Sequence, residues 1–118
     1  MIYHIVERQV LDNAQTAGTF MEPSLESEGF IHFSTQDQVA STALRHYQEK
    51  RDLVVFEIDE EDVKDQLRYE TAKHGESYPH VYSAIPVKII RRVFPIMKGM
   101  DGLFHWTLGD STSQVNPK

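Results

Sequence analysis

The apolar run within residues 52–59, DLVVFEID, is the feature that most limits how this chain can fold. In an extended segment its side chains alternate between two faces, and both faces here are mainly apolar. Such a strand is typical of the centre of a sheet that is covered on both sides. The sequence therefore predicts a central strand with Val54 and Phe56 buried.

Amphipathic segments on either side of this run predict two helices. Residues 7–17 carry an apolar stripe at helical spacing, and Gly18 follows as a stop signal. Residues 35–49 carry a second stripe, which begins at a capping box formed by Thr35 and Gln38. With further strands predicted at residues 2–6, 29–35, 67–71 and 87–96, the pattern favours an α+β fold with a mixed sheet and flanking helices.

The connecting segments carry weaker signals. Residues 20–28 break up around Pro23 and are predicted to form a loop that lies over a cleft. Residues 60–66 indicate acidic helical turns, and a loop is centred on Gly75. Strict alternation fails within residues 87–96, so a bulge is expected there. Phe104 and Trp106 are predicted to cover the core.

Length and composition limit the class of protein. A chain of 118 residues is expected to form one domain, here residues 1–110, followed by a polar C-terminal tail at residues 111–118. The formal net charge of −6 argues against general nucleic-acid binding. There is no cysteine, which excludes disulfides and thiolate chemistry. Without a signal-peptide pattern or an apolar run of membrane-spanning length, the chain is predicted to be cytoplasmic and not to bind membranes.

Two histidine-bearing segments carry the candidate functional residues. In GFIHFST, residues 29–35, alternation places Phe30, His32 and Ser34 on one face and apolar residues on the other. A strong helix start follows, and helix N-termini often bind ligands. In YPHVYSAIP, residues 78–86, alternation groups Tyr78, His80 and Tyr82. The two segments predict one shared cleft.

Structural roles and metal binding are the alternatives for these side chains. A strand histidine often donates a hydrogen bond to a backbone carbonyl, and Ser34 and Thr35 can be explained by helix capping. Tyrosines commonly fill pleated surfaces. His4, His32 and His80 with Glu70 would suit zinc, although no compact metal motif is present. His46 and His105 are given no role.

The order of these segments resembles a known but uncharacterised family. YHIV, SLESEGFIHFST with a following Gln38, an aliphatic strand ending in IDEEDV, and YPHVYSAIP are together similar to the domain of unknown function nine-five-two. More distantly, this order resembles the ADP-ribosyltransferase fold and its RNA 2'-phosphotransferase branch. The residues that match those strands are Tyr3, His4, Ile31, His32, Phe33, Ser34, Val81, Tyr82 and Pro86.

This resemblance implies an ADP-ribosyltransferase-like core with a cleft for NAD or another nucleotide-like small molecule. It implies that His4 or His32 fixes ribose hydroxyls, that Tyr78 and Tyr82 stack on a ring, and that Glu70 supplies a carboxylate. The candidate catalytic residues are His32 and Glu70, and the candidate ligand-binding residues are His4, Ser34, Thr35, Tyr78, His80 and Tyr82.

Two departures from the transferase pattern bear on catalysis. Ile5 stands where the transferases have glycine, and Glu28 stands where an arginine is expected. Phosphoryl groups are usually held by guanidinium groups, so RNA phosphate transfer is not expected. Divergent ADP-ribosyl transfer and a non-catalytic binding module both stay open, because a fold does not fix a function.

Overall fold

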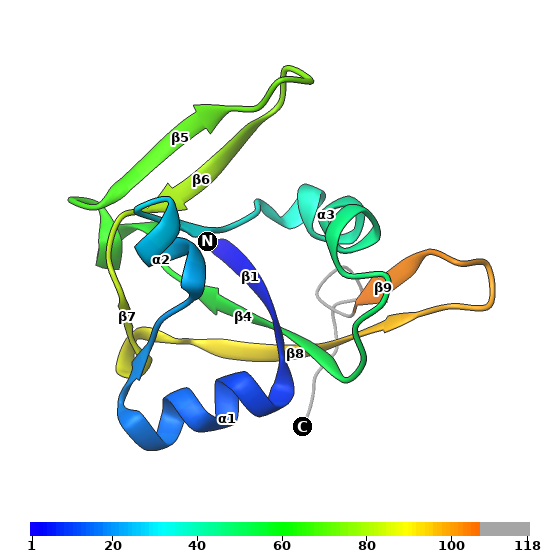
Figure 1. Ribbon diagram of the computed structural model, residues 1–118, viewed down its shortest axis with the longest axis horizontal. Coiled ribbons are helices and arrows are strands. Elements are labelled where there is room, and N and C mark those ends of the chain that lie inside the picture. The colour runs from blue at the N-terminus through cyan, green and yellow to red at the C-terminus, as the bar shows by residue number, and fades with distance from the viewer. Residues whose placement is uncertain (107–118) are drawn as a thin grey trace.

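A four-stranded sheet forms the centre of the computed structural model, which describes residues 1–106 (Figure 1). Its strands are β1 (Ile2–Glu7), β4 (Leu53–Ile58), β8 (Arg92–Lys98) and β9 (Phe104–Trp106), in the order β1-β4-β8-β9. Every residue of β4 is buried, which confirms the predicted central strand with Val54 and Phe56 inside. The predicted mixed sheet is wrong, because every strand pairing within residues 1–106 is antiparallel.

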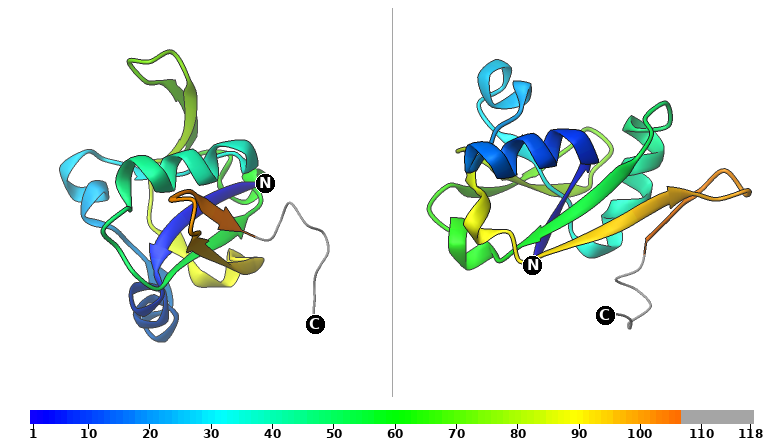
Figure 2. Two further views of the ribbon diagram at one scale, coloured as in Figure 1. Left: turned by 90° about the vertical axis from the view of Figure 1, so that its right-hand side faces the viewer. Right: turned by 90° about the horizontal axis from the view of Figure 1, so that it is seen from below.

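The two faces of this sheet support two apolar clusters, each covered by one helix (Figure 2). Helix α1 (Arg8–Ala17) packs Leu11 and Ala14 against the face that carries Val54 and Phe56. Helix α3 (Val39–His46) packs Val39 and Ala43 against the opposite face. Both helices agree with the sequence prediction, although the second begins as a 3-10 turn, η1 (Gln36–Gln38).

A second, smaller sheet lies beside β1. It contains β3 (Ile31–His32), β6 (Ser77–Val81) and β5 (Leu67–Thr71), in the order β3-β6-β5. A bridge between Tyr3 and Ser34 connects its inner edge to β1. The β5–β6 hairpin projects from the body of the molecule (Figure 1). A short ladder of β2 (Thr19–Phe20) and β7 (Ile85–Pro86) follows α1.

Several connecting segments differ from the prediction. Residues 20–28 contain the short helix α2 (Pro23–Ser27), which begins with a proline at its first position, where the missing N–H costs nothing. The predicted strand at 29–35 is reduced to the two residues of β3 and the single bridge at Ser34. The predicted strand at 87–96 is divided into a 3-10 turn, η3 (Val87–Ile89), and β8.

Other elements agree with the prediction. The acidic turn η2 (Glu60–Val63) precedes β5, and Gly75 lies in the loop between β5 and β6. Phe104 is buried, and Trp106 packs against the same cluster. The predicted tail at 111–118 and the last four residues of the predicted domain lie outside the described residues. Within residues 1–106, no helix has the length and apolar character needed to cross a membrane.

Candidate functional site

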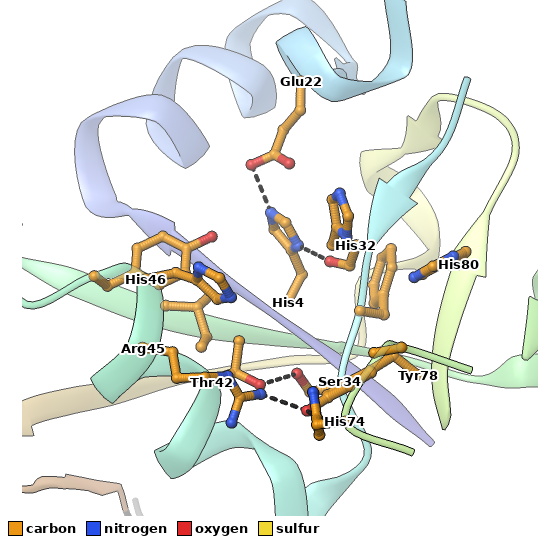
Figure 3. Close-up of a pocket in the computed structure, with 14 residues that line it drawn as sticks. His4, Glu22, His32, Ser34, Thr42, Arg45, His46, His74, Tyr78 and His80 are labelled. Atoms are coloured by element: carbon orange, nitrogen blue, oxygen red, sulfur yellow. Dashed lines mark hydrogen bonds and ion pairs between the residues drawn. The ribbon is translucent and has the colours of Figure 1, made fainter. Parts of the chain in front are cut away.

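A pocket of about 350 Å³ lies where β1, α3 and the β3-β6-β5 sheet meet (Figure 3). Five of the six histidines of the chain line it. The remaining lining is aromatic, polar or aliphatic, with one carboxylate and one guanidinium. The lining residues are His4, Ile5, Glu22, His32, Phe33, Ser34, Thr42, Arg45, His46, Tyr47, Ala72, His74, Tyr78 and His80.

One end of the pocket contains a buried imidazole–carboxylate pair. His4 is 2 % exposed, and its ring nitrogens lie 2.5 Å from the carbonyl oxygen of His32 and 2.7 Å from Glu22 Oε2. The carbonyl and the carboxylate can both accept hydrogen bonds, so both ring nitrogens of His4 are engaged by partners. Burial would raise the pKa of Glu22, but the charge and hydrogen bond of His4, with the charge of His32, lower it below its ordinary value. A buried contact between an imidazole and a carboxylate therefore forms one wall of the pocket.

The two histidine-bearing strands lie side by side, but of the predicted cleft residues only His32 and His80 line the pocket, and Tyr82 does not. β3 and β6 pair in a register that places His32 directly opposite His80, and their ring centroids are 5.2 Å apart. Phe30 stacks on His80 with the ring centroids 4.0 Å apart and lies 5.1 Å from the ring of Tyr82. Pro79 and the neighbouring Val81 are buried on the other face. As the alternation of side chains along a strand predicts, these aromatic and histidine side chains share one face of the sheet.

Glu70 lies behind His80 rather than in the pocket. β5 pairs with β6, and Glu70 Oε1 accepts hydrogen bonds from His80 Nδ1 at 2.6 Å and from the Tyr82 hydroxyl at 2.7 Å. These bonds, that of Tyr82 first, lower the pKa of Glu70 below its ordinary value. Glu70 is thus not among the residues that line the pocket, and the carboxylate that lines it is Glu22.

Hydroxyl and cationic groups gather at the other end of the pocket (Figure 3). Ser34 Oγ donates to Thr42 Oγ1 at 3.2 Å. The Arg45 guanidinium donates to the Tyr78 hydroxyl, which donates to Glu76 at 3.0 Å. His74 Nε2 lies 3.0 Å from the same hydroxyl. Burial, followed by the hydrogen bond to Glu76, raises the pKa of Tyr78.

The structure separates the predicted site residues into two groups. His4, His32, Ser34, Tyr78 and His80 line the pocket. Thr35 and Tyr82 do not: Thr35 caps the turn that opens α3, and the Tyr82 hydroxyl binds Glu70. The residues that the sequence interpretation missed are Glu22, Thr42, Arg45, His46, Tyr47 and His74.

Part of this missed set had a sequence signal. Thr42, Arg45 and His46 are spaced by three and four residues, which places them on one face of the predicted helix. Their alignment with the histidine strands follows only once the helix is packed. Glu22 had no signal, because it lies in a segment that was predicted to be a loop.

The geometry does not favour the metal alternative. Both ring nitrogens of His4 are occupied by the His32 carbonyl and by Glu22. In the part of the chain that the structure describes, no three histidine, aspartate or glutamate side chains are placed to hold a metal ion.

A family model described as "Protein of unknown function (DUF952)" matches residues 5–93, about three quarters of the chain. The chain belongs to this family. The DUF952 match spans β1 through the start of β8 and includes both histidine-bearing strands. No curated protein matches the chain.

Solved structures of protein CC0527 from Caulobacter crescentus have the same fold. The crystal structure is 29% identical, with a TM-score of 0.81, over 92% of this chain and 95% of that chain. The solution NMR structure is 28% identical, with a TM-score of 0.77, over 95% of this chain and 96% of that chain. The arrangement of two sheets and α3 therefore has an experimentally determined counterpart.

Proposed function

We propose that this DUF952 protein binds a nucleotide-like ligand of the NAD type in its histidine-lined pocket, as a divergent relative of the ADP-ribosyltransferases. The observation that carries the proposal is the division of polar groups in the pocket. Arg45, His74 and three hydroxyl groups gather at one end, and the Glu22 carboxylate lies beside His4 at the other. A ligand with phosphates on one side and a ribose on the other matches this division.

The phosphate end is built around Arg45. A guanidinium binds phosphate oxygens through paired N–H donors, and Tyr78 occupies only part of that donor set. His74 lies on the same tyrosine hydroxyl, and Ser34 and Thr42 offer hydroxyl groups nearby. On a chain with a net charge of −6, such a local gathering of donors favours an anionic ligand.

The ribose end is built around Glu22. Its lowered pKa keeps it ionised at neutral pH, next to the buried His4 ring. Cleavage of a glycosidic bond places positive charge on the anomeric carbon, and a fixed carboxylate stabilises that charge. Glu22 thus takes the part that the sequence interpretation had given to Glu70.

The size of the pocket limits how the ligand is held. A volume of about 350 Å³ is at the lower end of the range for small-molecule sites. This volume suits one of the two nucleotides of NAD. The other nucleotide would extend over the opening of the pocket. Tyr47 and Tyr78 line the walls as aromatic surfaces for a ring. Burial, followed by the charge of Glu22, raises the pKa of Tyr47 to about 12, so its hydroxyl stays neutral.

Thermal denaturation with a ligand panel tests the proposal. NAD, ADP-ribose and AMP should raise the melting temperature, and nicotinamide alone should not, because it lacks phosphate. At about 100 times the dissociation constant, binding stabilises the fold by about 2.7 kcal/mol. Arg45→Ala should remove the shift. Arg91→Ala is the matched control, because this exposed arginine lies outside the pocket.

Other ligand responses would replace the proposal. Stabilisation by zinc without any nucleotide response would favour the metal-binding alternative. An equal nucleotide shift in Arg45→Ala and in the unmodified chain would place the binding site elsewhere on the molecule.

A further inference from the structure

His80 is a pocket histidine whose ring is held in place while one of its nitrogens stays without a partner in the described residues. Its Nδ1 lies 2.6 Å from Glu70 Oε1, and the Tyr82 hydroxyl binds the same oxygen at 2.7 Å. Phe30 stacks on one face of the ring, with an interplanar angle of 13°. The side chain is only 14% exposed. Packing and hydrogen bonding therefore hold the imidazole in one orientation.

This orientation decides which nitrogen meets a ligand. An ionised carboxylate accepts hydrogen bonds but cannot donate them, so Nδ1 of His80 carries the proton. In neutral His80 the lone pair is then on Nε2, which makes no hydrogen bond within residues 1–106. Because Glu70 occupies Nδ1 and His80 lines the pocket, Nε2 is the ring nitrogen left for a ligand.

The other pocket histidines lack this combination. Both nitrogens of His4 are occupied. His32 lies 3.3 Å from Glu28, and His74 lies 3.4 Å from Glu76, but each ring is about half exposed and its partner is at the surface. His80 is thus the pocket imidazole with a close carboxylate, a stacked ring and an unoccupied second nitrogen.

We propose that His80 is the general base of the pocket and that Glu70 is its positioning residue, so that the chain activates a hydroxyl acceptor against the glycosidic carbon of the bound nucleotide. This inference rests on the proposed function and adds the class of acceptor, water or an alcohol. The imidazole–carboxylate arrangement is the one that activates hydroxyl nucleophiles in hydrolases, where the carboxylate fixes the tautomer.

The chemical step balances with NAD and a hydroxyl compound alone. His80 Nε2 takes the proton of the acceptor O–H, and the acceptor oxygen forms a bond to the anomeric carbon. The bond from that carbon to the nicotinamide nitrogen breaks, and its electron pair stays on the ring, which leaves as neutral nicotinamide. His80 then releases the proton to solvent.

The acceptor class follows from the strength of the base. A hydroxyl is a poor nucleophile until its proton is removed, so a positioned imidazole accelerates its attack. A guanidinium group holds its protons too strongly for an imidazole to remove one. Water and alcohols are therefore the acceptors that this arrangement suits.

The decisive experiment measures nicotinamide release from NAD, in water alone and with methanol as a second acceptor. His80→Ala and His80→Gln should each lower the rate by about a hundredfold or more. NAD affinity, measured by calorimetry, should change by no more than a few-fold. Added imidazole should restore part of the His80→Ala rate, which a purely structural role would not produce. The methanol reaction should yield the methyl glycoside of ADP-ribose, with the methoxy group on the anomeric carbon.

The positioning role of Glu70 and the control need separate variants. Glu70→Ala should lower the rate by about tenfold or more, and Glu70→Asp should recover part of it, since the carboxylate fixes the ring rather than reacting. His105→Ala is the matched control. That histidine also pairs with a carboxylate, Asp101 at 3.1 Å, but lies on β9 outside the pocket.

Two results would overturn the inference, and neither is confused with failure of binding. No nicotinamide release by the unmodified chain overturns it; calorimetry then shows whether NAD binding, and with it the proposed function, still stands. The second result is a tautomer. If ¹⁵N NMR of the ligand-free chain shows that neutral His80 carries its proton on Nε2, the inference is also overturned. The expected spectrum shows an Nδ1–H tautomer that is lost in Glu70→Ala.

Discussion

At the scale of single residues, the most constrained polar group outside the pocket is Glu57. It is 1% exposed in the middle of β4, yet each carboxylate oxygen has a partner. Arg92 donates to Oε1 at 2.9 Å and to Oε2 at 3.0 Å, and Tyr3 donates to Oε2 at 3.0 Å. Burial and Glu57 raise the pKa of Tyr3 far above its ordinary value. A buried carboxylate of this kind is tolerated because its hydrogen bonds are complete.

Arg92→Ala should therefore destabilise the fold by about 2 kcal/mol in urea denaturation. The cost is below that of a fully buried pair because Arg92 is 57% exposed and water can replace part of its contact. Arg91→Ala is the matched control. Arg91 pairs with Asp59 at 3.4 Å on the surface, where loss of the pair costs less than about 1 kcal/mol. Equal effects of the two variants would show that Glu57 does not depend on Arg92.

Glu22 predicts a pH dependence of stability. Its pKa is lower in the folded chain than its ordinary value of 4.5, because of His4 and His32 acting against burial. A lowered carboxylate pKa stabilises the fold above the ordinary value, and this contribution is lost as the pH falls through the lowered one. Glu22→Gln should cost about 1–2 kcal/mol at neutral pH and much less in acid.

Urea denaturation at about pH 7 and about pH 3 measures this difference, which should shrink on acidification. Glu28→Gln is the control, because Glu28 and His32 are half exposed and 3.3 Å apart, so little change is expected at either pH. A Glu22→Gln cost that stays constant between the two pH values would contradict the ionised pair.

Sequence periodicity predicted which side chains share a face of a strand. It did not predict which side chains form hydrogen bonds with one another. It placed His32, His80 and Tyr82 together, because adjacent strands align side chains of the same parity. It could not show that Glu70 binds His80 and Tyr82, because that depends on the register between β5 and β6. Arg45 was not predicted either, because its place beside the histidine-bearing strands depends on how α3 packs.

At the scale of elements, the turn that opens α3 connects helix, sheet and pocket. The capping box predicted from Thr35 and Gln38 is present, with Gln38 Oε1 accepting from the Thr35 N–H at 3.0 Å. The buried Gln38 also donates through Nε2 to the carbonyl of Ser77, at 2.7 Å, on β6. One amide thus fixes the start of α3 relative to the hairpin that carries Tyr78 and His80.

Gln38→Glu and Gln38→Ala separate these two hydrogen bonds. Glutamate keeps an acceptor for the Thr35 N–H but has no donor for the Ser77 carbonyl, so it should cost about 1–3 kcal/mol. Alanine loses both and should cost at least as much. Denaturant midpoints measure the order. If Gln38→Glu is as stable as the unmodified chain, the link to Ser77 contributes nothing.

The elements that sequence reasoning placed well have strong local signals. Both main helices have an apolar stripe and a start or stop residue, and β4 is apolar throughout. β3 was predicted too long because only Ile31 and His32 find a partner strand in β6. The segment at 87–96 was predicted as one strand because its apolar content hides the turn at Val87–Ile89. Pairing partners are long-range, and no local pattern reports them.

At the scale of the whole molecule, the pocket is a product of topology. Its walls come from β1, the segment before α2, α3 and the β5–β6 hairpin, which are far apart in sequence. The Tyr3–Ser34 bridge brings the two sheets together at this point. A second cavity, of about 370 Å³, lies at the other end of β4 and β8 and carries Arg8, Lys50, Arg51 and Lys98. The histidine-lined pocket and this second cavity are therefore both candidate binding regions for an anionic ligand.

Hydrogen exchange with and without NAD distinguishes the two regions. If the histidine pocket binds the nucleotide, protection should increase in α3 and β6, because both contribute lining residues and the ligand bridges them. Exchange in the β8–β9 hairpin should stay unchanged and serves as the internal control. Arg45→Ala should remove the added protection from both elements together. Protection confined to β8 and the residues around Arg51 would instead assign the nucleotide to the second cavity.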